Sequence, residues 1–335
     1  MTDLRAIRAG KPASYPDQTI HAEYAASVLG LGFTELDDGT GLLFEISSQV
    51  TRAAFGAGRG SFFPQNTATA ATLANDKYMA NTLMERAGIA TLGGDYFFLH
   101  ERHRRHRPPG HERDDAQALF HALGGSAFVK PLNGSRGDFA QAVTGGAALA
   151  DYLDQVAHYY DAVIMQRIVT GREYRIFVLD DTIVYSARKL PPAIIGDGRH
   201  SLRELLAEQN ATLSRHGVSS AMAGQADAAL DAVMSEGERF ELPGRMNRSA
   251  GGTMQFADPA DAEAAFATAR RALKALGLRA GAVDLFSEID GEDPAPHVIE
   301  VNANPSIRFL EDSGRADLIL RIWRHTFASL GLTDV

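Results

Sequence analysis

The segment 297–305 constrains the fold of this chain more than any other stretch. It reads His-Val-Ile-Glu-Val-Asn-Ala-Asn-Pro, so β-favouring residues alternate with Glu300 and Asn302. Side chains two residues apart on a strand share a face. We therefore predict a strand that directs these two oxygen-bearing side chains to the same side, with a turn at Asn304 and Pro305.

A second apolar run, at 281–286, places Asp284 in the middle of a predicted neighbouring strand. Buried carboxylates need a compensating charge. Two acids and an amide carbonyl that face one space suit a hard divalent cation held partly by phosphate oxygens. The other interpretation is an acidic edge strand that ends in a turn. These segments alone do not distinguish the cation site from the edge strand.

Composition limits the partners of the chain. Its 335 residues allow two or three subdomains, and its formal net charge of −9 argues against a nucleic-acid backbone as the main partner. There is no cysteine, which excludes disulfides, thiolate catalysis and thiolate metal sites. No signal peptide and no apolar run long enough to cross a bilayer is found. We therefore expect a cytoplasmic protein without a membrane partner.

Lys77 lies at the start of a helix predicted from residue 75 to 87, with Asp76 as its N-cap. A cation in the first turn is disfavoured by the helix dipole. The lysine is therefore either solvated or directed at an anionic partner such as phosphate. The predicted apolar face of this helix comprises Met79, Leu83 and Ala87.

Lys130 ends a predicted strand, 127–131, which runs into the glycine-containing turn 132–138. Backbone N–H groups of such a turn can bind phosphate. No glycine-lysine-serine/threonine sequence closes the turn, so it is not a Walker loop.

The segments 174–179 and 183–188 predict a hairpin about Asp180 and Asp181, preceded by a strand at 162–169. Glu173, Arg175 and Phe177 should alternate onto one face. With Arg188 and Lys189 at a strand end, these residues predict a basic pocket. Further helices are predicted at 115–123, 147–159, 259–276 (opened by Asp258 and Pro259) and 315–330.

The segment 100–111 contains four histidines and four arginines. The histidines suggest a metal site, but thiolate partners are absent and the arginines are clustered. A mobile, solvated basic insertion is the favoured interpretation.

These pieces together resemble the ATP-grasp superfamily, and within it the branch of cyanophycin synthetase, bifunctional glutathione synthetase and ribosomal-protein glutamate ligase. The resemblance covers roughly residues 65–312. It depends on the order of the motifs at 76–77, 128–131, 163–178, 187–205, 246–252, 282–286 and 299–305. It implies an α+β or α/β fold in which two α+β lobes clamp ATP. The expected parts are an N-terminal substrate-side segment (1–75), an N-lobe (76–165) and a C-lobe (166–335).

The resemblance also assigns roles to residues. Lys77 and Lys130 would contact ATP, the main chain of Gln166, Arg167 and Ile168 would bind adenine, and Glu173 would lie near the ribose. The loop over the phosphates would contain Gly134, Ser135 and Gly137. The family's magnesium ligands, which could also take Mn²⁺, match Asp284, Glu300 and Asn302. The residues expected at the γ-phosphate and the acyl intermediate are Lys130, Arg175, Arg188 and Asn247.

The activity implied is that of an ATP-dependent carboxylate–amine ligase, which forms an amide through an acylphosphate and uses an amino acid or small peptide. Two alternatives remain open: a non-catalytic ATP-binding protein, and a kinase that stops at phosphoryl transfer. Asp138 and Arg167 depart from the family pattern and favour the first alternative. Ala282 stands where D-alanine–D-alanine ligases carry arginine, which argues against that branch. Relatives are commonly dimers or tetramers, so a homo-oligomer is expected.

Overall fold

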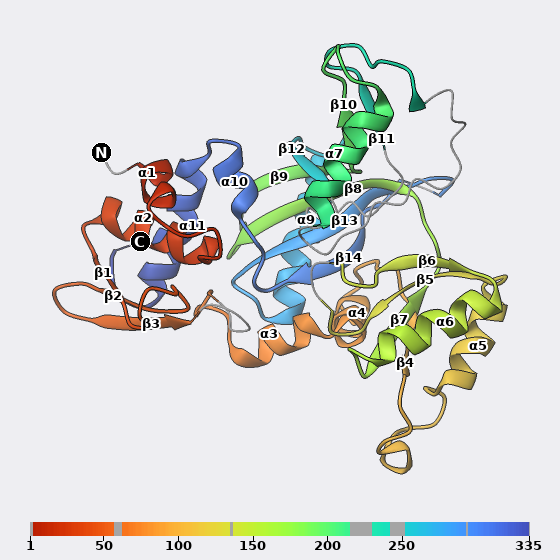
Figure 1. Cartoon of the computed structure of the whole chain (residues 1–335). Coiled ribbons are helices and arrows are strands. Elements are labelled where there is room, and N and C mark those ends of the chain that lie inside the picture. Colours follow the sequence, from red (N-terminus) through yellow and green to blue (C-terminus); the bar gives the residue numbers. More distant parts are fainter. Residues whose placement is uncertain are drawn as a thin grey trace.

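A computed structural model describes residues 3–56, 62–134, 137–214, 230–241, 252–292 and 294–334; for 209–214 it describes the backbone alone. It is a mixed α/β structure whose sheets are antiparallel, as expected for the predicted fold class. Figure 1 shows a central sheet between an N-terminal group of elements and a second sheet. Among the described helices, none is long and apolar enough to cross a membrane.

The central five-stranded sheet has the order β12-β9-β8-β13-β14. Its strands are β8 (Gly171–Leu179), β9 (Thr182–Leu190), β12 (Thr253–Phe256), β13 (Ala280–Ile289) and β14 (His297–Asn302). The predicted hairpin of β8 and β9 and the predicted strands around Asp284 and Glu300 are confirmed. Helix α9 (Ala262–Leu276) covers one face, on which Ile176, Val283 and Leu273 are buried together.

The four-stranded sheet has the order β4-β7-β5-β6. Its strands are β4 (Asp95–Phe98), β5 (Ser126–Pro131), β6 (Gln141–Thr144) and β7 (Ala162–Gln166). Helices α5 (Arg113–Ala122) and α6 (Gly146–Ala157) pack on one face, where Phe120, Leu149 and Leu153 join the core. Lys130 and Ile164 are paired on the opposite face, away from these helices.

The N-terminal elements form a core with the last two helices of the chain. They are α1 (Leu4–Ala9), α2 (Asp17–Leu29), β1 (Gly32–Glu35), β2 (Leu43–Ser47) and β3 (Arg52–Gly56), packed with α10 (Arg308–Asp312) and α11 (Ala316–Ser329). Both termini therefore lie on the same side of the molecule (Figure 1). Leu318, Ile322 and Phe327 of α11 are buried, as predicted.

Helices α3 (Ala68–Asn75) and α4 (Lys77–Arg86) join the N-terminal elements to the four-stranded sheet. Asp76 caps α4 as predicted, because its carboxylate accepts from the N–H groups of Tyr78 and Met79. The predicted apolar face is wrong at Met79, which is 49% exposed, and at Ala87, which is exposed and lies just after the end of the helix. The helix instead buries Lys77, Ala80, Asn81 and Met84. Its buried side is thus partly polar, which apolar periodicity does not detect.

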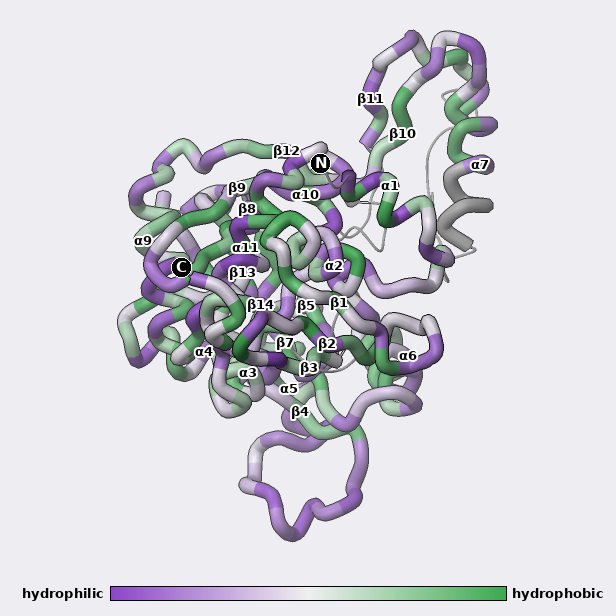
Figure 2. Tube along the Cα trace, turned by 90° about the vertical axis from the view of Figure 1, so that its left-hand side faces the viewer, coloured by the Kyte–Doolittle hydropathy of each residue, from purple (hydrophilic) through white to green (hydrophobic). Residues whose placement is uncertain are grey.

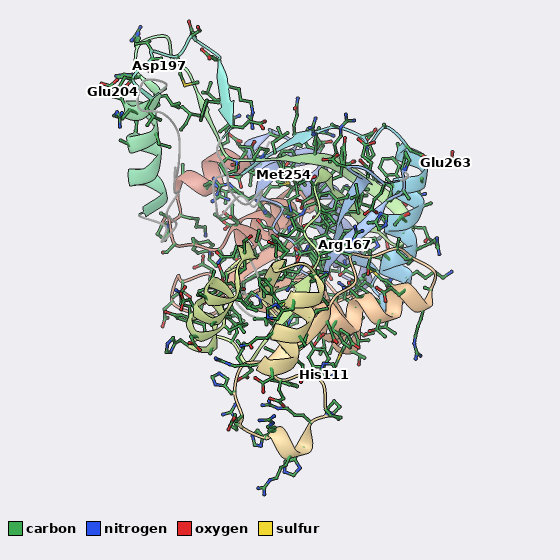
Figure 3. The ribbon with its side chains drawn as sticks, turned by 90° about the vertical axis from the view of Figure 1, so that its right-hand side faces the viewer. His111, Arg167, Asp197, Glu204, Met254 and Glu263 are labelled. Atoms are coloured by element: carbon green, nitrogen blue, oxygen red, sulfur yellow. The ribbon has the colours of Figure 1, made fainter. Side chains whose placement is uncertain are left out.

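A small projecting unit contains β10 (Ala193–Ile195), α7 (Leu202–Ser214) and β11 (Arg239–Glu241). Figure 3 places Asp197 and Glu204 in this unit, at the opposite end of the molecule from His111. The expected start of α9 at Asp258 and Pro259 is wrong by a few residues, because Asp261 caps that helix through the N–H of Ala264.

Candidate active site

Four charged residues of the central sheet, Glu173, Arg175, Asp284 and Glu300, lie on its face away from α9. Arg175 of β8 pairs with Asp284 of β13, and Asp284 pairs with Glu300 of β14. Residues directly opposite each other on neighbouring strands share a face. Glu173, Arg175 and Phe177 therefore alternate onto one face as predicted. Asn302 is opposite Ala282, which puts it on the same face as Glu300.

Asp284 is fully buried and makes a bidentate ion pair with Arg175. The guanidinium Nε and Nη2 donate to its two oxygens, each at 2.8 Å. Burial opposes ionisation of Asp284, but the neighbouring Arg175 and Lys189 outweigh it and hold the pKa of this carboxyl below its usual range. Asp284 is therefore a carboxylate at neutral pH.

Lys189 is the second cation on this face, and it is buried. The sequence placed it in a basic pocket, but the family resemblance assigned it no role. Its Nζ lies 3.3 Å from Asp284 and forms an ion pair with Glu173. Burial works against its charge, but Asp284 and Glu173 outweigh burial and raise the pKa of Lys189. Burial raises the pKa of Glu173, against the attraction of Lys189.

Arg188 is exposed and lies opposite Tyr174, on the face that α9 covers. The structure therefore does not bring Arg188 to Arg175, and the expectation of Arg188 on this side of the sheet is wrong. The reason is a β-bulge between Phe177 and Val178, which shifts the pairing of β8 and β9 by one residue. A shift of one residue exchanges the two faces of a strand, so Lys189 replaces Arg188.

Lys130 reaches this face from the four-stranded sheet. Its side chain is buried, and burial lowers the pKa of Lys130 to about 8 against attraction from Glu300 and Glu173. Together with Lys77, it completes a group that we call the charged cluster, with four cations and three carboxylates. The cluster consists of Lys77, Lys130, Glu173, Arg175, Lys189, Asp284 and Glu300.

Lys77 holds the start of the glycine turn. Its Nζ donates to the carbonyl of Leu132 at 3.2 Å and to that of Gly134 at 2.8 Å. Burial lowers the pKa of Lys77, although Glu300 opposes the shift. Gly134 is tightly packed, since a Cβ there would lie 2.8 Å from the Cβ of Pro131. Gly137 adopts a left-handed φ of 69°.

The segment after β7 leads from one sheet to the other. Gln166 is buried and donates to the carbonyl of Gly93 at 2.6 Å. Arg167, labelled in Figure 3, lies in the middle of the molecule and pairs with Glu292, while Ile168 is 43% exposed. Ser135 and Asn247 lie outside the described residues, so the structure does not place them relative to the cluster.

The oxygen donors of the site fit a hard divalent cation in part. Asp284 and Glu300 are cross-strand neighbours, and the amide of Asn302 lies 3.4 Å from a carboxylate oxygen of Glu300. Among the described residues, no group of three histidine, aspartate or glutamate side chains could hold a metal alone. Mg²⁺ commonly binds through one or two carboxylates and takes its other ligands from water and phosphate, so these residues suit it only together with a phosphate ligand.

Comparison with solved structures shows a likeness over most of the chain. A bifunctional glutathione synthetase from Pasteurella multocida aligns with a TM-score of 0.54 at 18% identity, over 91% of this chain and 43% of that one. This chain shares the fold of that protein, which is the ATP-grasp fold that the sequence resemblance predicted.

The chain also has relatives by sequence. Cyanophycin synthetase of Trichormus variabilis is 27% identical over 219 residues, which are 58% of this chain and 24% of that protein. The glutathione biosynthesis bifunctional protein GshAB of Streptococcus thermophilus is 29% identical over 168 residues, 44% of this chain and 22% of that protein. The chain thus spans less than a third of the length of these relatives. No protein-family model matches it.

Proposed function

We propose that the chain is an ATP-dependent carboxylate–amine ligase that joins an amino acid or small peptide to an amine through an acylphosphate. The observation that carries the proposal is the charged cluster, in which two buried lysines, Lys130 of the four-stranded sheet and Lys77 of α4, face Glu300 of the central sheet. Such a cluster matches a polyphosphate ligand better than a structural core, because its four cations, three of them buried lysines, exceed its three carboxylates. The ATP-grasp fold and the sequence relatives support the same activity.

ATP would lie between the two sheets. Lys130 would neutralise phosphate oxygens, while Lys77 would hold the backbone of the loop that contains Gly134, Ser135 and Gly137. The main chain of Gln166, Arg167 and Ile168 would bind adenine, with Glu173 towards the ribose. Asp284, Glu300 and Asn302 would hold Mg²⁺ or Mn²⁺, which supplies charge neutralisation between the phosphates when bound.

Transfer of the γ-phosphoryl group to a carboxylate brings two anions together, so fixed cations must offset their charge. Arg175 and Lys189 are the two cations that this face of the central sheet holds beside Asp284, and we assign them that role. An amine then attacks the acylphosphate carbonyl, phosphate leaves, and the amine loses a proton as the amide forms. A guanidinium such as that of Arg175 would stabilise the oxyanion of the tetrahedral intermediate. No side-chain nucleophile is required.

The three-part division at residues 75 and 165 and the assignment of Asn247 to the acyl intermediate are parts of this proposal. So are a cytoplasmic location, a homo-oligomeric state and the absence of a nucleic-acid partner. The acidic net charge of −9 supports the last of these.

The test is to incubate the protein with ATP, Mg²⁺ and paired amino acids or short peptides, measuring ADP release and the masses of products. We expect ADP, phosphate and a new amide in equal amounts, and loss of turnover by at least about 100-fold in Glu300→Gln. A stable phosphorylated product without an amide would instead indicate a kinase. Tight ATP binding without ADP release for any pair would indicate a non-catalytic protein, and full turnover of Glu300→Gln would refute the metal assignment.

A further inference from the structure

A strongly basic loop projects from the four-stranded sheet, and the proposed ligase chemistry does not use it. We define the basic loop as residues 100–111, which connect β4 to α5 and include the short 3₁₀ turn Arg104–His106. Figure 2 shows this connection as an extended hydrophilic loop that stands away from the body of the molecule. All but two of its twelve residues are exposed.

The base of the basic loop is fixed by specific contacts. The guanidinium of Arg107 lies 3.9 Å above the Phe98 ring and donates to the carbonyl of His100 at 2.7 Å. His111 stacks on Tyr96 with ring centres 4.0 Å apart, and its carbonyl accepts from the N–H of Phe98. These contacts close the loop at its base, so the tip is presented in a defined place.

The tip carries cations that the protein itself neutralises poorly. Arg102 is 72% exposed and lies 3.8 Å from Asp161, and Arg104 is 56% exposed and lies 3.6 Å from Glu101. Exposed ion pairs of this kind contribute little to stability, so these arginines can exchange their partners. Arg105 makes no ion pair within the described residues. Residues 100–107 contain four arginines and one glutamate, a formal net charge of +3 in a chain whose net charge is −9.

The basic loop leaves the sheet beside the glycine turn. Phe98 at the end of β4 pairs with Ala162 of β7, and the N–H of Leu132 donates to the carbonyl of Ala162 at 3.0 Å. The two loops therefore emerge at the same end of the four-stranded sheet. A partner held by the basic loop would lie at the phosphate-loop end of the N-lobe.

The surroundings of the tip restrict the kind of partner. Asp161 is 75% exposed and Asp154 is 68% exposed, so the basic area is small and bordered by acids. A nucleic-acid backbone needs a longer basic surface and usually aromatic side chains for stacking, and residues 100–107 contain no phenylalanine, tyrosine or tryptophan. An anionic membrane favours apolar anchors, and this loop has none. Arginine pairs well with single carboxylates through two hydrogen bonds.

We propose that the tip of the basic loop, at Arg102, Arg104 and Arg105, is a docking site for a short acidic segment of a polypeptide partner. The partner would carry a run of aspartate or glutamate residues that can place one carboxylate on each guanidinium. This binding needs neither ATP nor turnover, so it goes beyond the proposed ligase activity and can be tested separately.

The experiment measures fluorescence anisotropy of a labelled hexaglutamate peptide with the full chain at several salt concentrations. The variant is Arg102→Glu/Arg104→Glu/Arg105→Glu. The matched control, Arg5→Glu/Arg321→Glu/Arg324→Glu, changes the net charge equally at exposed arginines far from the loop. We expect the loop variant to bind at least about tenfold more weakly than the wild type, the control to stay within about twofold, and salt to weaken wild-type binding.

Two results would overturn the proposal. The first is equal hexaglutamate affinity in the loop variant and the wild type, which would place the peptide elsewhere. The second is tighter binding of labelled oligothymidylate, or of phosphatidylserine vesicles, than of hexaglutamate, which would assign the loop to another class of partner. Circular dichroism of the three proteins checks that each is folded, and ADP release from the same variants reports separately on the ligase activity.

Discussion

Arg188 and Lys189 are neighbours in the sequence, yet they occupy opposite faces of β9. Lys189 is 6% exposed and contacts Asp284 and Glu173, whereas Arg188 is exposed. The single extra residue in the β8–β9 pairing decides which of the two cations enters the charged cluster.

The first prediction compares these two residues. Lys189→Met removes the cation that pairs with Glu173 and one of the two cations that pair with the buried Asp284, so we expect it to lower the free energy of unfolding by about 3–5 kcal/mol and to abolish ADP release. Arg188→Met removes an exposed side chain and should change stability by no more than about 0.5 kcal/mol. For each variant, urea unfolding measures the free energy of unfolding, and ADP release measures the activity. Equal effects of the two substitutions would show that the assigned faces are wrong.

The second prediction concerns Lys130, whose pKa is lowered by burial from 10.5 to about 8. The phosphates of ATP favour the protonated amine, so we expect ATP to bind more weakly as the pH rises through about 8. Lys130→Gln should bind ATP weakly with little dependence on pH across that range. Calorimetry at constant Mg²⁺ concentration measures the ATP affinity at each pH. The control is Lys274→Gln, at an exposed position, which should bind ATP as the wild type does.

The lowered pKa of Lys130 also makes the free energy of unfolding depend on pH. Between about 8 and 10.5 the unfolded chain binds a proton on this lysine that the folded chain does not. Stability increases with pH wherever the unfolded state binds more protons. The contribution of Lys130 to the free energy of unfolding should therefore rise across that interval and be smallest below it.

At the scale of elements, the glycine turn after β5 and the first turn of α4 depend on each other. Lys77 donates to the carbonyl of Gly134, and Asp76 caps the helix that carries the lysine. The placement of Lys77 at a helix N-terminus, unfavourable by the helix dipole, is compensated by these carbonyl acceptors. The sequence suggested an anionic partner for Lys77, and the described structure adds loop carbonyls as direct partners.

The third prediction tests this coupling. In Gly134→Ala the new Cβ would lie 2.8 Å from Pro131, so the turn must shift and change the carbonyl position that Lys77 contacts. We expect ATP affinity to fall about tenfold, because overpacking of this kind costs about 1–3 kcal/mol. Gly146→Ala is the matched control, since no atom lies within 4 Å of its added Cβ. Unchanged ATP affinity in Gly134→Ala would separate the turn from the nucleotide site.

At the scale of the whole molecule, the two ends of the chain form one core. Phe44 and Phe55 stack with ring centres 5.2 Å apart, and Phe55 contacts Trp323 and Phe327 of α11. Phe177 and Tyr185 of the central sheet belong to the same buried group. The N-terminal strands are therefore packed through α11 onto the sheet that carries the charged cluster.

The fourth prediction follows from that shared core. Phe44 is fully buried, so Phe44→Ala should lower the free energy of unfolding by about 3–5 kcal/mol. Trp323 is the only tryptophan and is fully buried, so its emission reports on unfolding. Val50→Ala, at a position 89% exposed, is the control and should change stability little. If Phe44→Ala left the Trp323 transition unchanged, the N-terminal strands would unfold separately from α11.

The sequence by itself determined the strand carrying Glu300 and Asn302, the strand carrying Asp284, the hairpin of β8 and β9, and the N-cap at Asp76. These features depend on residues that are close in the sequence, because alternation, turn residues and capping involve only a few neighbouring positions. The ordered motifs also predicted the ATP-grasp fold. The periodicity failed at Met79, where the buried face of α4 is partly polar.

Only the tertiary structure decided which charges meet. A bulge of one residue put Lys189 in place of Arg188, and strand pairing set Arg175 against Asp284. Two separate sheets then brought Lys130 towards Glu300, and the last helix completed the N-terminal core. Register and the packing of one sheet against another depend on contacts between residues far apart in the chain, so alternation within a single strand does not determine them.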